Sequence, residues 1–282
     1  MNEKYKLIPT AALVMHWAEE LYQRKPANHF LDTLDLSAGD NILKECNETC
    51  NWYKEVILNR NNLIYHLISH QLLETQEKPQ IVILAAGMCP LSINLLYQYG
   101  SKIAHIFEID KAHMEKKSRI YKEMFPEYMN KLTCFSFDIT RRDLINHLYH
   151  EEHFKIERPT LVIAEGISYY ISPTDLKKLI IDFSSPQRMN RFIVDYQVPY
   201  NEVNDNKRHI PQNIFGIIRD HCQVPPPITT YTQNDLEYLF EEVWGKVDEN
   251  YDLKNMEFLR KGKNEYFKTR KEGWIECVVG KI

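Results

Sequence analysis

The sequence lacks the features that would associate it with nucleic acid, a membrane or the secretory pathway. Its 35 basic and 39 acidic side chains nearly balance, and the formal net charge of −4 provides no positive field to attract a polyanion. Apolar runs are too short to cross a bilayer, and the polar residues 1–6 do not lead into the apolar segment of a signal peptide. We expect a soluble, cytoplasmic protein that binds neither nucleic acid nor membrane.

The chain also has little that could hold a metal ion or a disulfide framework. Its six cysteines show no CxxC spacing, which is typical of reduced, scattered packing residues. His66 and His70 are spaced for one helical face, and histidines recur every third residue over 147–153, but nothing completes either ligand set. We expect no metal site.

What the sequence has is an ordinary globular composition, 44% hydrophobic and 26% charged, with enough length for one α/β domain with additions. After residue 80, short apolar runs alternate with helical patterns, an order typical of a doubly wound, Rossmann-like sheet. That α/β architecture is the fold class we expect. Strands are expected at 80–84, 102–109, 132–137, 160–164, 191–195 and 274–279.

Two segments outside this alternation are expected to cover the sheet. The N-terminal part shows helical periodicity over about 10–34 and 49–72, the second stretch broken near 59–62, and is a candidate lid. A polar, irregular segment follows the fifth strand and is too long for an ordinary connection, which indicates a substrate cap. The expected divisions of the single domain 1–282 are the helical lid 1–75, the cofactor-binding core 76–198, the inserted cap 199–230 and the C-terminal part of the core 231–282.

Several helix starts carry capping signals. Ser172-Pro173-Thr174-Asp175 combines an N-cap serine, a proline at the first helical position and an acidic third residue. Thr232-Gln233-Asn234-Asp235 predicts a capped helix through Glu242, and Thr140 with Asp143 resembles a capping box.

The first strand leads into the most informative turn, Ala85-Ala86-Gly87-Met88-Cys89-Pro90. An apolar run that ends in small residues before a proline predicts strand, tight turn and helix. Small residues let a backbone approach a ligand, and the helix start offers unpaired N–H groups. An ordinary strand-to-helix connection would look similar. The residues at the other strand ends must therefore show whether this turn binds a ligand.

Carboxylates follow the next strands, where ligands bind in an open α/β sheet. Asp110 ends the second strand about twenty residues after the glycine turn, the position of a ribose acceptor, with Glu108 as the alternative. Asp138 and Glu165 end the next two strands. Any one of these acids could be a helix cap, but four consecutive strand ends with ligand-type residues indicate one shared crevice.

The turn restricts the choice of cofactor. Compared with G-x-G-x-x-G it lacks two glycines, which disfavours a nicotinamide oxidoreductase because the pyrophosphate would lose its close approach. A cofactor without pyrophosphate, such as S-adenosylmethionine, requires only one close backbone approach and acceptors for ribose, adenine and amino groups.

Four segments then resemble one family. They read Leu-Ala-Ala-Gly-Met over 84–88, Phe-Glu-Ile-Asp over 107–110, Phe-Asp-Ile over 137–139 and Pro-Thr-Leu-Val-Ile-Ala-Glu-Gly-Ile-Ser-Tyr-Tyr over 159–170. In this order they are similar to the leucine carboxyl methyltransferase family, class I S-adenosylmethionine-dependent O-methyltransferases that include bacterial relatives acting on small molecules. The resemblance extends from roughly 60 to 197, and more weakly over 274–280.

The resemblance implies a cofactor-binding set. Arg60 would pair bidentately with the methionine carboxylate, and Glu165 would lie beside the methionine amino group. Asp110 would hold the ribose hydroxyls. The complete expected set is Arg60, Ala85, Gly87, Asp110, Asp138, Ile139 and Glu165, with Gly87 under the methionine and Asp138 and Ile139 at the adenine.

The acceptor side is implied less specifically. Tyr170 matches a family tyrosine that could orient an acceptor oxygen, so it is the catalytic candidate. Tyr169 would border the methyl donor. Asp195 and Tyr196 end the fifth strand and could line the acceptor pocket, although packing in the core is an equal alternative for Tyr196. The basic residues over 207–209 could attract an anionic acceptor or be solvated.

We therefore expect an S-adenosylmethionine-dependent O-methyltransferase that acts on a carboxylate or hydroxyl of a small molecule such as a secondary metabolite, as a monomer or homodimer. One departure from the family matters: its first turn usually reads G-x-G-x-D, whereas Ala85 and Cys89 replace the first glycine and the aspartate. Two alternatives stay open, a protein C-terminal carboxyl methyltransferase and a non-catalytic S-adenosylmethionine-binding protein.

Overall fold

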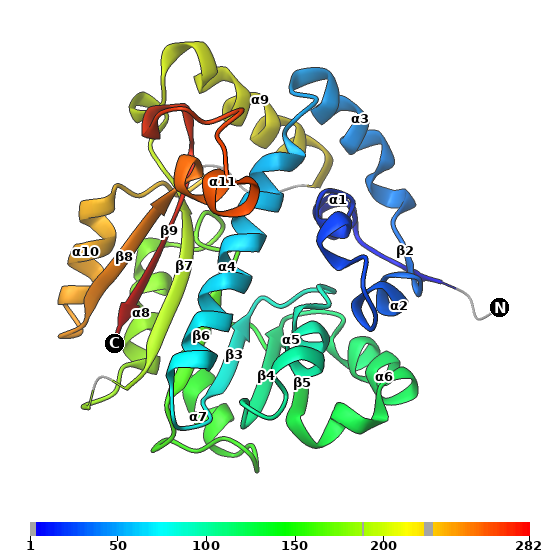
Figure 1. The fold of residues 1–282 in the computed structure, drawn as a ribbon, viewed down its shortest axis with the longest axis vertical. Helices are drawn as coiled ribbons and strands as arrows, with labels where there is room; N and C mark the ends of the chain where they lie inside the picture. Colours follow the sequence, from blue (N-terminus) through cyan, green and yellow to red (C-terminus); the bar gives the residue numbers. More distant parts are fainter. Residues whose placement is uncertain (1–3, 188, 223–227) are drawn as a thin grey trace.

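A computed structural model describes residues 4–187, 189–222 and 228–282, and its central feature is a seven-stranded sheet in the order β5-β4-β3-β6-β7-β9-β8 (Figure 1). The first five strands along the chain run parallel, whereas β9 is antiparallel to both neighbours. The strands are β3 (Gln80–Leu84), β4 (His105–Asp110), β5 (Leu132–Ser136), β6 (Thr160–Ala164), β7 (Arg191–Gln197), β8 (Lys246–Asp252) and β9 (Ile275–Lys281). This order confirms the expected doubly wound α/β fold.

Helices cover both faces because the chain winds outward from the centre in two directions. From β3 it proceeds to β4 and β5, then crosses back to β6 and continues to β7, so the strand order reverses between β3 and β6. That reversal is where open α/β sheets bind ligands. The helices of this core are α4 (Lys54–Glu74), α5 (Leu91–Tyr99), α6 (Met114–Met124), α7 (Leu144–Tyr149), α8 (Pro173–Phe183), α10 (Gln233–Glu241) and α11 (Leu253–Lys261).

Three of the remaining helices form one layer at the carboxyl ends of the parallel strands, while the short α2 (Ala27–Leu31) contacts α5. Helices α1 (Pro9–Ala18), α3 (Asp40–Thr49) and α9 (Asp205–Cys222) contact one another there, although α9 lies more than 150 residues from the other two in sequence (Figure 1). Glu45 of α3 accepts a hydrogen bond from His221 of α9, with an Oε1–Nε2 distance of 2.9 Å. The N-terminal segment and the insertion after β7 therefore build a single cover.

Several expected boundaries are correct and others are wrong for identifiable reasons. Strands 80–84 and 160–164 are as expected, and Ser172 and Thr232 cap α8 and α10 through bonds to the third helical residue. Thr140 and Asp143 form no capping box, because Thr140 donates to Asp138 and Asp143 pairs with Arg141.

The expected break at 59–62 is also wrong. Helix α4 runs unbroken through it, and the polar residues Asn59, Arg60 and Asn61 are buried rather than looped out. A run of polar residues can indicate a turn, but here these residues lie inside a helix and their side chains are buried.

The cap and the chain ends differ from expectation as well. Residues 205–222 of the supposedly irregular cap are helical, with Pro211 inside the helix, while residues 223–227 of the cap lie outside the described residues, as do 1–3 of the lid. Strand β8 and helix α11 were not predicted. The lid is not all helix, since β1 (Tyr5–Lys6) pairs with β2 (Leu34–Asp35). Within the described ranges, no helix has both the length and the apolarity to cross a bilayer.

Candidate active site

The turn after β3 has the backbone conformation of a ligand-binding loop. Gly87 has a φ of +49°, and a Cβ built on it would meet no atom within 4 Å, so open space lies where a side chain would be. Ala85 has a φ of +51°, a left-handed conformation that costs an alanine roughly 1–2 kcal/mol. The replacement of a glycine by Ala85 therefore keeps the turn's geometry at the expense of local strain.

Asp110 is fixed against this turn. Its Oδ2 accepts a hydrogen bond from the Gly87 N–H at 2.9 Å, and its Oδ1 accepts one from the Ala112 N–H at 3.2 Å. Each carboxylate oxygen has more than one acceptor position. Asp110 is thus oriented at the end of β4 and can still accept bonds from a pair of hydroxyls.

Glu108, the alternative ribose acceptor, is committed elsewhere. It is 1% exposed and forms an ion pair with the fully buried Lys117 of α6, with an Oε2–Nζ distance of 2.8 Å. The Cys134 thiol and the Tyr121 hydroxyl donate to the same carboxylate. This environment removes Glu108 from the ribose role.

Asp138 and Ile139 follow β5 at the same edge of the sheet. Thr140 donates to Asp138 Oδ1 through its N–H at 3.0 Å and its hydroxyl at 2.7 Å, and these two bonds lower the pKa of Asp138. Both bonds reach one oxygen, so Thr140 does not engage Oδ2. Asp138 is exposed while Ile139 is buried, which places a charged acceptor beside an apolar side chain.

The centre of the site is the Arg60 guanidinium, which is 5% exposed in the middle of α4. Its Nη2 lies 3.3 Å from Glu165 Oε1 at the end of β6, and its Nη1 lies 3.4 Å from Asp195 Oδ2 on β7. Nη1 also donates to the Tyr169 hydroxyl at 2.8 Å, and Nε donates to Asn61 at 3.2 Å. All three guanidinium nitrogens are therefore engaged.

Gly166 follows Glu165 with a φ of +69°, a left-handed conformation that favours glycine. A Cβ there would lie 3.5 Å from Arg60 Nη1, an ordinary van der Waals contact, so the backbone conformation and not the space accounts for the glycine. Its N–H donates to Asp195 Oδ1 at 2.6 Å. The left-handed turn at this glycine thus directs its N–H to Asp195, beside the arginine.

Charge is unevenly balanced in this cluster, because one guanidinium faces the two carboxylates of Glu165 and Asp195. Burial raises the pKa of Glu165, and the Asp195 charge raises it further, whereas Arg60 opposes the shift. The excess of negative charge favours a ligand group that is cationic.

The expected acceptor residues fall into three environments. Tyr170 is 44% exposed and meets the Tyr169 ring edge to face at 5.2 Å, so it borders the open side of the cluster. Tyr169 and Asp195 are buried beneath it, joined by a bond of 2.7 Å from the hydroxyl to Oδ2. Tyr196 is fully buried, and its hydroxyl donates to Glu276 and not to any residue of this group. It therefore packs in the core, the alternative left open for it by the sequence.

The basic residues of the cap do not face the cluster freely. Lys207 pairs with Glu272 at 3.3 Å and lies over the rings of Trp52 and Phe267 at 5.5 and 5.4 Å. Arg208 pairs with Asp205. The suggestion that these cations attract an acceptor is not supported by their contacts.

One residue of the site carries no signal in the sequence. Tyr22, at the end of the 3₁₀ turn η1 (Glu19–Tyr22), is 5% exposed, and its hydroxyl lies 3.2 Å from Cys89 Sγ in the binding turn. Only the tertiary packing of the lid brings the two together.

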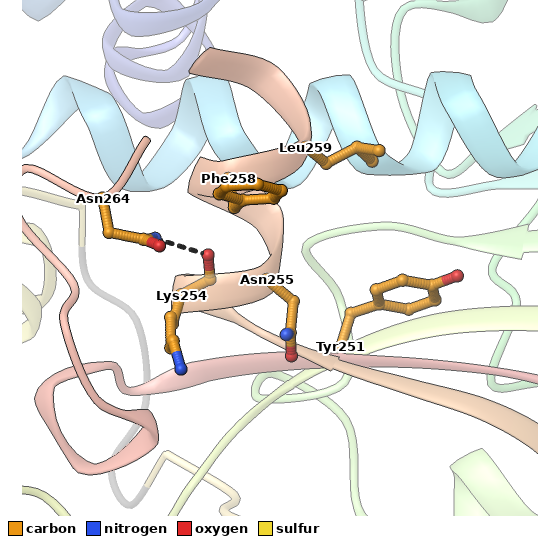
Figure 2. Close-up of a pocket in the computed structure, with 6 residues that line it drawn as sticks. All are labelled: Tyr251, Lys254, Asn255, Phe258, Leu259 and Asn264. Carbon is orange, nitrogen blue, oxygen red and sulfur yellow. Dashed lines mark hydrogen bonds between the residues drawn. The ribbon is translucent and has the colours of Figure 1, made fainter. Parts of the chain in front are cut away.

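A surface hollow lies away from this cluster. It measures about 380 Å³ and lies along α11, where Asn264 donates to the Lys254 carbonyl at 2.7 Å beside the exposed Phe258 (Figure 2). It contains no cluster of acids and bases. Across the described ranges, no three His, Cys, Asp or Glu side chains are grouped to hold a metal ion.

Comparison with solved structures defines the class of fold. A candidate methyltransferase from Thermobifida fusca YX superposes with a TM-score of 0.66 at 13% identity, covering 97% of this chain and 95% of that one. A DUF574 family protein from Streptomyces avermitilis MA-4680 gives 0.63 at 8%, covering 97% of each chain. The geranyl diphosphate C-methyltransferase of Streptomyces coelicolor A3(2) gives 0.50 at 10%, covering 78% and 77%. The fold is that of Rossmann-like methyltransferases.

The family follows from the sequence itself. Residues 14–183 match the model of the leucine carboxyl methyltransferase family, more than half of the chain, and the protein belongs to that family. It is therefore an S-adenosylmethionine-dependent methyltransferase, which confirms the family, enzyme class and cofactor expected from the motifs. No curated protein matches the chain.

The Lys117–Glu108 pair allows a test of whether Glu108 stabilises the fold or binds the ribose. Lys117→Met should lower the free energy of unfolding by about 3–5 kcal/mol, because it leaves the buried Glu108 carboxylate without a cationic partner. Urea denaturation would measure this. The double variant Lys117→Met/Glu108→Leu should regain most of the loss and bind S-adenosylmethionine with unchanged affinity; weakened binding in a stable double variant would return the ribose role to Glu108.

Proposed function

We propose that this protein transfers the methyl group of S-adenosylmethionine to a carboxylate or phenolic oxygen of a small molecule. The observation that carries the proposal is the convergence of the Arg60–Glu165 pair with the Gly87–Asp110 turn at the switch point of the sheet. The pair offers opposite charges for the amino and carboxylate groups of a methionine, and the turn offers acceptors for a ribose.

The residues present fit the cofactor. Arg60 would turn one edge of its guanidinium to the methionine carboxylate, and Glu165 would accept from the amino group. Gly87 leaves backbone space for the thioether chain, because nothing occupies the position of its missing side chain. Asp110 would accept the ribose hydroxyls, and Asp138 with Ile139 would contact the adenine through Oδ2 and the apolar side chain. Ala85, which is expected in the same set, would contribute through the left-handed conformation that it gives the turn.

When bound, the cofactor supplies an electrophilic methyl group on a sulfonium, so the protein needs only to present an acceptor oxygen in line with it. Tyr170, which is exposed beside Tyr169, would donate a hydrogen bond to such an oxygen. Tyr169 and Asp195 act beneath it by holding Arg60 in place. Alignment of this kind can supply much of the reduction in barrier.

The kind of acceptor oxygen depends on whether the site has a free carboxylate that could act as a general base. Asp195 uses both oxygens, one on Gly166 and one on Tyr169 and Arg60, and Glu165 is paired with Arg60. Neither is placed as a free general base. The site therefore suits an oxygen that is ionised or readily ionised, a carboxylate or a phenol, better than an aliphatic alcohol.

Two measurements test this function. Calorimetric titration with S-adenosylmethionine and S-adenosylhomocysteine, with NADH as control, should show micromolar binding of the first two only. Transfer of radiolabelled methyl should then be assayed on matched acceptors that differ only in bearing a carboxylate, a phenol or an aliphatic hydroxyl, and on peptides with a free C-terminal leucine. Methylation confined to the peptides would replace the small-molecule proposal, and cofactor binding without transfer to any acceptor would favour the non-catalytic alternative.

The ribose assignment predicts a large effect of one substitution. Asp110→Ala should weaken S-adenosylmethionine binding by about 2–4 kcal/mol, because it removes a charged acceptor of two hydrogen bonds and frees the Gly87 N–H. Calorimetry would measure the dissociation constant. Asp143→Ala removes another aspartate, the half-exposed partner of Arg141, and should leave affinity unchanged; equal affinity in both variants would move the ribose elsewhere.

Glu165 predicts how binding depends on pH. Its carboxylate must be ionised to attract an ammonium group, and its pKa is raised by burial, so affinity should be full well above that pKa and fall as the pH drops through it. The loss should therefore begin at a higher pH than for an ordinary glutamate. Titrations over about pH 5 to 8 would measure it. Glu165→Gln should bind more weakly and lose this dependence; an unaltered pH profile would assign the dependence to another group.

A further inference from the structure

The N-terminal lid is attached to the cofactor-binding core by few polar side-chain contacts. Among the described residues, two hydrogen bonds join lid residues before α4 to this core: Tyr5 to His113, with an Oη–Nδ1 distance of 2.6 Å, and Tyr22 to Cys89 at 3.2 Å. The second bond reaches the binding turn itself, two residues beyond Gly87. The segment η1 that carries Tyr22 also packs against α4, the helix of Arg60.

The surroundings of Tyr22 place it at the methionine end of the site. Burial raises its pKa well above the ordinary value, Cys89 and Glu165 add to the shift, and Arg60 opposes it. The hydroxyl therefore keeps its proton. The pKa of Cys89 is raised to about 11, chiefly by burial and then by Glu165, so the thiol is neutral as well. Two uncharged groups thus meet beside the Arg60–Glu165 pair.

We propose that Tyr22 is a positioning residue of the cofactor site, whose hydrogen bond to Cys89 holds the N-terminal lid closed over the binding turn and slows release of the cofactor. The inference rests on the cofactor site proposed above. Cys89 stands where the family's turn has an aspartate, and here its side chain binds the lid.

The geometry restricts how such a bond can act. Both partners lie in the protein and neither is charged, so the bond contributes by keeping the lid in place rather than by attracting a ligand. A lid that opens more easily lets the cofactor leave sooner, whereas the rate of encounter is set by diffusion and by access to the site. The expected signature is a faster dissociation rate with an association rate that does not fall.

Stopped-flow measurement of S-adenosylhomocysteine binding would test this. Tyr22→Phe keeps the buried ring and removes the hydroxyl, and it should raise the dissociation rate constant roughly two- to tenfold, the range expected for one net hydrogen bond. Cys89→Ala, which keeps Tyr22, should do the same. The double variant should release no faster than the faster single variant, because both substitutions break one bond.

Controls separate this effect from general destabilisation. Tyr65→Phe removes a tyrosine hydrogen bond to Gln98, 2.7 Å long, on the outer side of α4 and should leave the rates unchanged. Thermal unfolding of each variant would identify loss of folding, and Cys89→Ala carries the test should Tyr22→Phe not fold. Unchanged dissociation in both single variants, or effects that multiply in the double variant, would overturn the proposal. Absence of binding by the wild-type protein would instead remove the cofactor site on which it rests.

Discussion

The structure depends on holding one guanidinium in a place where water cannot reach it. Arg60 is buried in α4 and contacts the ends of β6 and β7 through Glu165, Tyr169 and Asp195. Removing a charge from water is costly unless its donors find partners, and the network gives each of the three nitrogens at least one, with only Glu165 at Nη2. The position of α4 against the sheet, the left-handed Gly166 and the buried Asp195 are all consequences of that requirement.

Helix α4, which carries Arg60, also connects the lid to the site. Helix α4 carries Arg60 toward the sheet, while its other polar residues Glu55 and Asn59 bind Arg260 of α11, with an Nε–Oδ1 distance of 2.7 Å from Arg260 to Asn59. Helix α4, which has polar contacts to β6, β7 and α11, supports the cover through α1, and α3 and α9 pack against α1 in turn. The Arg60 network itself is built from α4, β7 and the residues at and after the end of β6, without side chains of α1 or η1.

The sequence predicted the parts of this arrangement that are local or repetitive. Strands 80–84 and 160–164, and the caps of α8 and α10, follow from patterns within a few residues. The acids at strand ends were found because parallel strands end at one edge of a sheet, and the family resemblance added Arg60 before any fold was known. The wrong predictions concern features that depend on distant residues. The sequence indicates a break at 59–62 because it does not show which partners bury these polar residues. Glu108 is buried against a lysine whereas Asp110 accepts from the binding turn, and the sequence shows neither contact. Nothing in the sequence relates Tyr22 to Cys89, because the two are 67 residues apart.

The altered turn shows how a family site can tolerate unusual residues. Ala85 keeps the left-handed conformation that a glycine would adopt freely, which implies that contacts around the turn compensate for its strain. Two are visible, the Ala86 N–H donating to the Ile109 carbonyl at 3.0 Å and the Gly87 N–H donating to Asp110. An aspartate at position 89 would add a carboxylate near Glu165, which already shares Arg60 with Asp195, whereas a neutral thiol adds no charge. The loss of the aspartate thus lowers repulsion within the cluster and leaves the binding of a cationic cofactor to Glu165, which is consistent with a turn that has been modified rather than disabled.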